Sequence, residues 1–274
     1  MARPLKVACL QTSPKPSVNS ALEEALPLAK QAVSAGAQFL FLPEYCGGLM
    51  SEGSALVPPI FAENEHPFLA AFQGFDRAYG VWIMIGSIAI SVPGGKIINR
   101  GFVLDAEGEI VSLYDKLHMF DIQISDTEVY RESARVAPGE NSCLVVTGFA
   151  KIAHTICYDV RFPHLYRDLA KAGAEILCVP AAFTKKTGEA HWHVLNRARA
   201  IENGAYVVSP CAVGPVDGGG ETYGHSLIID PWGEVLVDGG DNHGVVTAKI
   251  DLDKVAKARG KIPSLTHDRP YNMS

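Results

Sequence analysis

The sequence lacks the features that mark several classes of protein. It has no cluster of lysine and arginine residues, and its formal net charge is −6 at pH 7, which argues against a general nucleic-acid-binding surface. No apolar run approaches the length of a membrane span, and the N-terminal residues lead into a strand without the apolar core of a signal peptide. The six cysteines have no paired spacing that would indicate a disulfide framework. We therefore expect a soluble protein of the cytoplasm that binds neither nucleic acid nor membrane.

What the sequence does contain is typical of a globular α/β protein. Its 274 residues are 47% hydrophobic and 20% charged, which suits one large domain or two small ones. Apolar runs alternate with helical periodicities along the chain. They predict strands at residues 5–10, 38–42, 81–90, 101–104 and 109–114, and helices at residues 18–34, 68–79 and 191–203.

The second half of the sequence repeats the first. Ala-Gly-Ala at residues 35–37 precedes an apolar strand that ends in a proline, and the same pattern recurs at residues 172–180. The predicted hairpin at residues 104–111 likewise recurs at residues 229–236. The chain is therefore expected to hold two copies of one β–α–β–α–β–β–β unit.

Two such units bury most surface as two sheets packed back to back. Each unit would form a sheet with helices on one face, and its other face must be buried as well. The prediction is a four-layer αββα sandwich of two mixed sheets with an internal pseudo-twofold duplication. Because residues 140–148 are too short and apolar to be a linker, residues 1–274 are predicted to form a single domain.

The chemistry centres on Ile-Cys-Tyr-Asp-Val-Arg-Phe-Pro at residues 156–163. A short apolar strand ends at Cys157, and Asp159 and Pro163 suit the start of a helix. A cysteine at such a corner is lifted out of the sheet beside the backbone N–H of Tyr158, which pairs a nucleophile with an oxyanion donor. The alternative is that Cys157 is a small buried apolar residue.

Two charged residues also follow predicted strands. Glu44 comes directly after the strand at 38–42, and Lys116 comes after the strand at 109–114. The residue equivalent to Glu44 in the second copy is Ala181, which cannot ionise. Sites in open α/β sheets lie at the carboxyl ends of strands. The alternative is that either charge is merely solvated at a sheet edge.

These residues together form a catalytic set. A thiol is a poor nucleophile at its free pKa, so Cys157 needs a base or a neighbouring positive charge. Glu44, with its pKa raised in an apolar pocket, would be that base and would return the proton to the leaving amine. Lys116 would balance its charge and, with the Tyr158 N–H, stabilise the oxyanion.

The motifs resemble those of the nitrilase, or carbon–nitrogen hydrolase, family. The resemblance rests on Leu-Pro-Glu at residues 42–44, Tyr-Asp-Lys-Leu-His at 114–118 and the segment at 156–163, in that order, and it covers nearly the whole chain. It implies the four-layer fold, the same Glu, Lys and Cys roles, and attack on an amide, carbamoyl or nitrile carbon through a thioester or thioimidate. It also implies a homodimer or higher homo-oligomer, and no metal or organic cofactor.

The same resemblance adds a second glutamate. Tyr-Arg-Glu-Ser at residues 130–133 is similar to a family segment that carries an active-site glutamate between the lysine and the cysteine. Glu132 is therefore expected to position Lys116 and the substrate or water. The alternative is an exposed loop carboxylate.

Several further stretches look like one branch of the family, which hydrolyses ω-amides of small dicarboxylates and deaminated glutathione. That likeness places Arg161, Phe183 and Thr187 around a substrate carboxylate, which suits a guanidinium fork and an aromatic wall. Pairing of Arg161 with Asp159 or a helix carbonyl is the alternative. Residues 124–127 read Ile-Ser-Asp-Thr where many members have Pro-Gly, so the exact substrate stays open, as does gating by the loop at 124–131.

Other polar residues are interpreted as structural. His191 and His193 flank a tryptophan, but no carboxylate partner is apparent, so a metal site is not expected there. Arg197, Arg199 and Glu202 lie at helical spacing, which favours a salt-bridged helix surface or a dimer contact.

The sequence therefore predicts an amidase that releases ammonia from a small carboxylate-bearing amide, with deaminated glutathione as the expected substrate in metabolite repair. The nearest alternatives are an ω-amidase acting on α-ketoglutaramate or α-ketosuccinamate and an N-carbamoyl amidase, ahead of a nitrilase. An alternative of another class is an interaction protein that has kept the fold and lost the chemistry.

Overall fold

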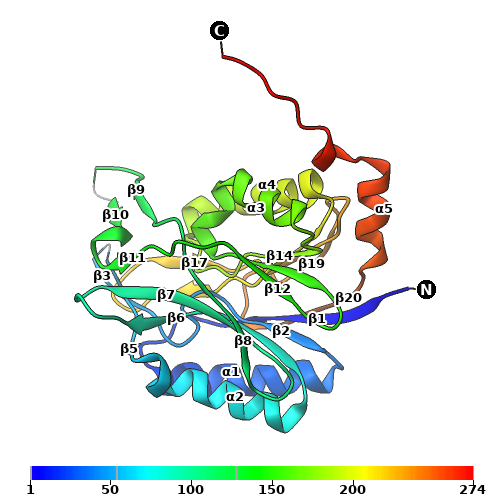
Figure 1. The fold of residues 1–274 in the computed structure, drawn as a ribbon. Helices are drawn as coiled ribbons and strands as arrows, with labels where there is room; N and C mark the ends of the chain where they lie inside the picture. The colour runs from blue at the N-terminus through cyan, green and yellow to red at the C-terminus, as the bar shows by residue number, and fades with distance from the viewer. Residues whose placement is uncertain (1, 54, 127–128, 274) are drawn as a thin grey trace.

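The chain folds into four layers (Figure 1). A computed structural model describes residues 2–53, 55–126 and 129–273. Helices α1 (Val18–Ser34) and α2 (Pro67–Tyr79) cover the outer face of one sheet, and α3 (Pro163–Lys171) and α4 (Lys185–Asn203) cover the outer face of the other. The predicted αββα sandwich is confirmed. Helix α5 (Asp253–Lys261) follows the last strand, at one edge of the layers.

The first sheet is mixed. Its strands run in the order β8–β7–β6–β2–β1–β20, with β11 also pairing β7 and β5 also pairing β6. Strands β1, β2 and β6 are parallel, and β7, β8 and β20 pair antiparallel to their neighbours. The bounds are β1 Pro4–Gln11, β2 Phe39–Phe41, β5 Ile60–Phe61, β6 Trp82–Ser91, β7 Ile97–Leu104, β8 Ile110–Asp115, β11 Val136–Ala137 and β20 Gly244–Asp251.

The second sheet repeats this topology. Its order is β19–β18–β15–β14–β13–β12, again with three parallel strands at the centre and antiparallel strands outside. The bounds are β12 Cys143–Val146, β13 Lys151–His154, β14 Ile176–Cys178, β15 Tyr206–Ser209, β18 Leu227–Ile229 and β19 Val235–Asp238. Because strand order and direction agree position by position, the predicted internal duplication is confirmed.

The two sheets share one apolar core. Phe39 and Phe41 of β2 contribute side chains from the first sheet, and Ile176 and Cys178 of β14 contribute them from the second; all four are fully buried. Strands buried on both faces read as continuous apolar runs, which is why these strands were recognisable in the sequence. Buried alanines of α1 at helical spacing form part of the outer core over the first sheet.

The sheets approach closely where the site lies. Gly86 of β6 has no side chain, and a β carbon there would lie 2.1 Å from the carbonyl oxygen of Leu42 and 2.5 Å from the Pro180 side chain. Leu42 follows β2, and Pro180 is at the equivalent position after β14. The glycine therefore permits contact between the two equivalent strand ends.

Several elements differ from the expectation. Helix α4 begins at Lys185, six residues before the predicted start, because its first turns are polar and carry Gly188, where a β carbon would lie 2.2 Å from the Tyr223 ring. Strand β7 likewise begins at Ile97. Short hairpins were not predicted: β3 Met50–Glu52 with β4 Ala55–Val57, β9 Asp121–Gln123 with β10 Val129–Arg131, and β16 Val213–Pro215 with β17 Glu221–Tyr223.

Single-turn 3-10 helices complete the described structure. They are Glu63–Glu65, Glu132–Ala134, Cys157–Arg161 and Ser264–Thr266. Among the residues described, no helix combines the length and the apolar character that a membrane crossing needs.

Candidate active site

One pocket brings together the polar residues that the sequence singled out. Glu44, Lys116, Glu132 and Cys157 all line it, although they come from four separate segments and both halves of the chain. Glu44 follows β2, Lys116 follows β8 and Cys157 follows β13. The strand ends bring these residues together, since the carboxyl ends of neighbouring strands meet at one edge of each sheet.

Lys116 lies between two carboxylates. Its Nζ is 2.9 Å from Glu44 Oε1, and 3.0 and 2.9 Å from the two oxygens of Glu132. The three side chains are at most 5% exposed. Neither glutamate is therefore a solvated edge or loop carboxylate, and Glu132 contacts Lys116 as the family resemblance implied.

The oxygens of Glu44 are each held by a donor. Asn99 of β7 donates its side-chain N–H to Oε1 at 2.9 Å, and the backbone N–H of Ala182 donates to Oε2 at 2.9 Å. The Cys157 thiol lies close enough to this carboxylate for each group to shift the pKa of the other. Ala181, which is equivalent to Glu44 in the second half of the chain, is thus the neighbour of Ala182, whose N–H orients Glu44.

Cys157 occupies a strained corner. Its φ is +48°, a conformation that non-glycine residues rarely adopt and that costs about 1–2 kcal/mol. Its N–H donates to the carbonyl of Pro180 at 2.9 Å, and the 3-10 turn Cys157–Arg161 follows at once. Pro163 then opens α3. The predicted strand-to-turn-to-helix corner is present, with its sulfur at the pocket.

Asp159 fastens this corner to the segment that carries Lys116. Its carboxylate is fully buried and accepts bonds from the Tyr114 hydroxyl at 2.7 Å and the Ile156 N–H at 2.8 Å. Its other oxygen contacts the His118 N–H at 3.1 Å and the His118 Nδ1 at 2.7 Å. A single carboxylate thus ties the turn of the cysteine to the chain on both sides of the lysine.

A buried arginine supports the same turn from behind. Arg199 of α4 donates from Nε to the carbonyl of Val160 at 2.9 Å. Its ion pair with Glu202, at 2.8 Å, agrees with the helical spacing, but the side chain of Arg199 is only 6% exposed. The interpretation of Arg199 as a surface or dimer residue was therefore wrong, because its guanidinium serves the nucleophile turn.

The charges perturb one another. Burial raises the pKa of Glu44, but the adjacent ammonium and hydrogen bonds outweigh it, so the pKa lies below its usual value. The expected raised pKa was therefore wrong, because Lys116 is in direct contact. Burial and the Glu44 charge hold the pKa of the Cys157 thiol well above its usual value. Burial lowers the pKa of Lys116, but the charges of Glu132 and Glu44 raise it by more, so the pKa lies well above its usual value.

In this arrangement the thiol is neutral, its neighbour is a carboxylate and the lysine is charged. The first hydrogen bond of the 3-10 turn joins the Asp159 N–H to the Ile156 carbonyl. The N–H of Tyr158, one residue earlier, is therefore a leading N–H group of this turn. Leading N–H groups of a helical turn have no partner within the turn. The arrangement can therefore deprotonate a thiol as it attacks a carbonyl carbon and stabilise the negative charge that develops on the carbonyl oxygen.

The proposed carboxylate pocket is partly assembled. Phe183 and Thr187 line the same cavity as Cys157, whereas the Arg161 guanidinium lies 5.4 Å from the Phe183 ring centre and 5.8 Å from that of Tyr158. Neither partner of the alternative for Arg161 is found among the described residues: Asp159 is bonded to other groups, and Arg161 bonds His191 and no helix carbonyl. Within the described part of the chain, Arg161 contacts His191 at 3.3–3.4 Å and forms no ion pair.

Several pocket residues were missed in the sequence. Phe120 and Tyr130, beside the β9–β10 hairpin, line one wall, and Val216, Gly219 and Gly220 after β16 line another. No periodicity marks such loops. Asn99 left a readable signal, since it is a polar residue in an otherwise buried strand. Thr127 lies outside the described residues; it belongs to the stretch 124–127, where the sequence departs from the family pattern.

Sequence and structure comparisons identify similar proteins. The carbon–nitrogen hydrolase family model matches residues 6–260. The chain is 38% identical over 270 residues, 97% of its length, to deaminated glutathione amidase of Synechocystis sp., 98% of which is covered.

Solved structures agree in fold. The NitFhit protein of C. elegans superposes with a TM-score of 0.88 at 29% identity, covering 98% of this chain and 66% of that protein. A mutant amidase of Nesterenkonia sp. AN1 superposes with a TM-score of 0.78 at 25% identity, with 92% of each chain covered. That structure shows covalent addition of the acetamide moiety of fluoroacetamide at the active-site cysteine.

Proposed function

Because the chain belongs to the carbon–nitrogen hydrolase family, it is a hydrolase of amide C–N bonds, and we propose that its substrate is deaminated glutathione. The observation that carries the mechanism is the convergence of Glu44, Lys116 and the Cys157 thiol on one buried pocket, in which Lys116 contacts Glu44 at 2.9 Å. The similarity to amidases of that name supports the substrate.

The first half of the reaction acylates the cysteine. Glu44 accepts the thiol proton as Cys157 sulfur attacks the amide carbon, which avoids a free thiolate in a buried site. The resulting oxyanion is stabilised by the charge of Lys116 and by the Tyr158 N–H. Glu44 then gives the proton to the leaving nitrogen, the C–N bond breaks, and an acyl thioester remains on Cys157.

The second half restores the enzyme. Glu44 accepts a proton from a water molecule, whose oxygen attacks the thioester carbon. The C–S bond breaks, the sulfur recovers the proton, and the carboxylic acid leaves. Glu132 acts by holding Lys116, since both of its oxygens contact Nζ and its Oε2 also accepts the Phe120 N–H at 2.6 Å.

The identity of the leaving group separates the candidate substrates. Deaminated glutathione holds a 2-oxoglutaryl group in amide linkage to cysteinylglycine, so hydrolysis releases that dipeptide through its amino group. Ammonia, which the sequence interpretation expected, would leave only from a primary ω-amide such as α-ketoglutaramate. The two substrates give the same acyl thioester and differ in what departs.

The cationic groups around the pocket suit a substrate with two carboxylates. Arg161 stands beside the Phe183 wall, forms no ion pair with any described residue and is proposed to bind one of these carboxylates, with Thr187 nearby. A second, smaller hollow shares Phe120, Tyr130 and Glu132 with the main pocket and is also lined by Arg131 and Arg135. Deaminated glutathione has a carboxylate at each end, whereas α-ketoglutaramate has only one.

The deciding experiment is an amide panel with purified protein. Deaminated glutathione, α-ketoglutaramate, α-ketosuccinamate and an N-carbamoyl amino acid are compared by kcat/KM, with 2-oxoglutarate, dipeptide and ammonia measured separately. We expect deaminated glutathione to exceed the others by at least about tenfold, which corresponds to 1.4 kcal/mol of transition-state binding. Faster release of ammonia from a primary amide would reject this substrate while leaving the amidase chemistry intact.

The role of Cys157 is tested separately. Fluoroacetamide should alkylate this cysteine by displacement of fluoride, and peptide mapping should find the adduct at Cys157 ahead of the other five thiols. Cys157→Ala should abolish turnover. Turnover by that variant would refute the thioester mechanism whichever amide is preferred.

We also propose a homodimer in the cytoplasm. Val194 and Ile201 of α4 are 68% and 53% exposed, and Trp232 near Ile201 is 58% exposed. Exposed apolar side chains that lie together often mark a protein–protein interface. Free cysteines throughout the chain suit a reducing compartment. The core shared by both sheets supports treating residues 1–274 as one domain. Sedimentation velocity of wild type and Ile201→Glu tests the dimer, which the charge should dissociate.

A further inference from the structure

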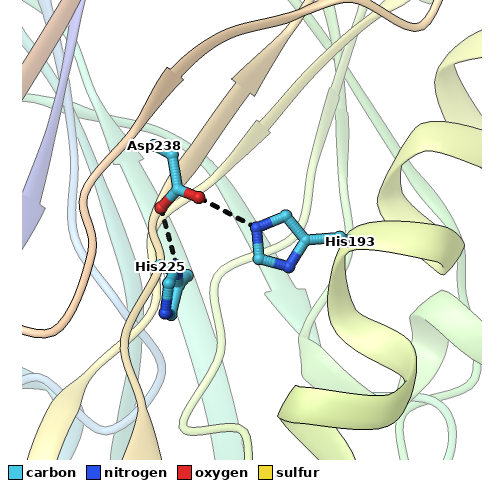
Figure 2. Close-up of side chains that lie close together, drawn as sticks. All are labelled: His193, His225 and Asp238. Carbon is cyan, nitrogen blue, oxygen red and sulfur yellow. Dashed lines mark hydrogen bonds and ion pairs between the residues drawn. The ribbon is translucent and has the colours of Figure 1, made fainter.

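Three potential metal ligands converge outside the active-site pocket (Figure 2). His193 projects from α4, His225 lies between β17 and β18, and Asp238 ends β19. His193 Nε2 is 2.9 Å from one oxygen of Asp238, and His225 Nδ1 is 2.8 Å from the other. Within the described residues this is the one grouping of His, Cys, Asp and Glu atoms close enough to share an ion, all within 4.8 Å of one another.

The contacts of this cluster place carboxylate oxygens and imidazole nitrogens face to face. His225 faces a carboxylate at each ring nitrogen, because its Nε2 is also 3.1 Å from Asp241. Asp238 meanwhile faces two imidazole nitrogens and accepts the Gly240 N–H at 2.9 Å. A cation bound between them would be coordinated by Asp238 and by the two imidazole nitrogens that face it.

We propose that His193, His225 and Asp238 bind a divalent first-row transition-metal ion of the zinc type. Two imidazole nitrogens and one carboxylate oxygen are ligands that Zn²⁺ prefers, and they leave a fourth, tetrahedral position for water. Mg²⁺ and Ca²⁺ prefer all-oxygen sites, so they do not fit this donor set. Ligand bonds of about 2.0–2.2 Å require donor atoms roughly 3.3 Å apart. The contacts of Asp238 with the two imidazoles, at 2.9 and 2.8 Å, would open to that spacing, and all the donor atoms already lie within 4.8 Å of one another.

The surroundings hold the ligands in a binding arrangement. Asp241 at His225 Nε2 would fix Nδ1 as the nitrogen without a proton, as outer carboxylates do for histidine ligands. The Tyr223 ring stacks on His225 with centres 4.5 Å apart, and the Trp192 indole N–H donates to the His225 carbonyl at 2.8 Å. The three side chains are 21–35% exposed, so an ion can enter from solvent.

Such an ion would join three segments, of which α4 contributes Thr187 to the pocket. It would tie α4 to β19 and to the turn after β17, the strand whose last residue, Tyr223, donates its N–H to the carbonyl of Phe183 at 2.8 Å. Phe183 lines the active-site pocket, but the metal ligands do not. The metal site is therefore structural and takes no part in amide hydrolysis, and it stands whether or not the proposed substrate is correct.

Calorimetric titration of untagged protein with Zn²⁺ tests the proposal. Wild type should bind one ion per chain, and Zn²⁺ at a hundredfold excess over Kd should raise Tm by about 5 °C or more. Asp238→Asn and His193→Ala should lose both effects. Asp241→Asn should weaken binding by about 10–100-fold. His243→Ala, which removes an exposed histidine beyond the cluster, should bind as wild type does, and Mg²⁺ should give no signal.

Contrary results are equally clear. Equal zinc affinity in wild type, Asp238→Asn and His193→Ala would overturn the proposal. Binding that survives in those two variants but disappears in Cys157→Ala would assign the ion to the catalytic thiol instead. Unchanged Tm and no heat of binding with wild type would mean that the cluster is held by hydrogen bonds alone.

Discussion

Replacement of Asp159 by asparagine tests whether one buried carboxylate holds the active site together. The carboxylate faces four donors, two on each oxygen: the Tyr114 hydroxyl and Ile156 N–H, and the N–H and Nδ1 of His118. Asparagine keeps one carbonyl oxygen and puts an NH₂ group in place of the other. In either orientation, two donors then face a donor.

The structure sets the size of the effect. A hydrogen bond to a charged group contributes about 1.5–3 kcal/mol, so loss of two should cost about 3–6 kcal/mol of unfolding free energy. For a chain of this length the Tm should fall by roughly 10 °C or more. The change should also release the strained Cys157 corner from the segment of Lys116. Since a misplacement of about 1 Å can cost a hundredfold in rate, kcat should fall by about that factor.

Stability and activity must be measured together. Urea unfolding gives the free energy, and kcat is measured at a temperature where near-ultraviolet circular dichroism shows the variant to be folded. Tyr114→Phe removes one donor only and should fall between wild type and Asp159→Asn in both measurements.

Asp230→Asn is the matched control. Asp230 is a buried turn aspartate that accepts the Trp232 N–H at 2.8 Å and the Glu234 N–H at 3.2 Å, in the β18–β19 hairpin. Both N–H groups bond the same oxygen, Oδ1, which asparagine keeps, so the replacement removes a buried charge and its contact with Lys254 at 3.3 Å and should leave kcat of the folded enzyme unchanged. A folded Asp159→Asn variant with wild-type kcat would refute the positioning role.

Three further changes test the charges and the contact between sheets. Because the pKa of Glu44 is lowered, its carboxylate persists as pH falls, and the acid limb of kcat/KM should lie below pH 4.5. Because the pKa of Cys157 is well above its usual value, kcat/KM should stay level from pH 7 to 9, and an increase centred near the ordinary thiol pKa of about 8.5 would contradict general-base activation. Lys116→Met leaves the buried carboxylates of Glu44 and Glu132 without a counter-ion and should lower the free energy of unfolding in urea by about 3–5 kcal/mol. An unchanged free energy of unfolding would mean that these carboxylates are not charged. Gly86→Ala should destabilise by about 1–3 kcal/mol through overpacking, whereas Gly74→Ala in open space on α2 should stabilise by about 0.5–1 kcal/mol; similar effects at both sites would refute the close approach.

Much of the fold could be predicted because both faces of each sheet are buried. Apolar runs such as β2 and β14 leave an unmistakable strand signal, and their repetition after Ala-Gly-Ala revealed the duplication. The start of α4 could not be predicted, since its first turns face the pocket and the Tyr223 ring rather than the core. The small hairpins had no periodicity to read, because they pack at the mouth of the site.

The members of the site could be predicted better than their electrostatics. Glu44, Lys116 and Cys157 follow strands whose ends must meet, so their convergence followed from topology. The direction of the Glu44 pKa shift did not, because it depends on a 2.9 Å contact with Lys116 that opposes the effect of burial. The contacts of Asp159 and Asn99 were also invisible, since a sequence shows that a polar residue is buried but not which partner satisfies it.

The duplication explains how the site divides its labour. The strand ends after β2 and β14 are equivalent, yet one carries Glu44 and the other Ala181, whose neighbour Ala182 supplies an N–H to that glutamate. Two charged carboxylates at equivalent positions would repel each other across the close approach at Gly86. One half therefore provides the charged groups, and the other provides the thiol and the backbone donors. Since neither half holds a base beside a nucleophile, the reaction requires the two sheets to pack in this register.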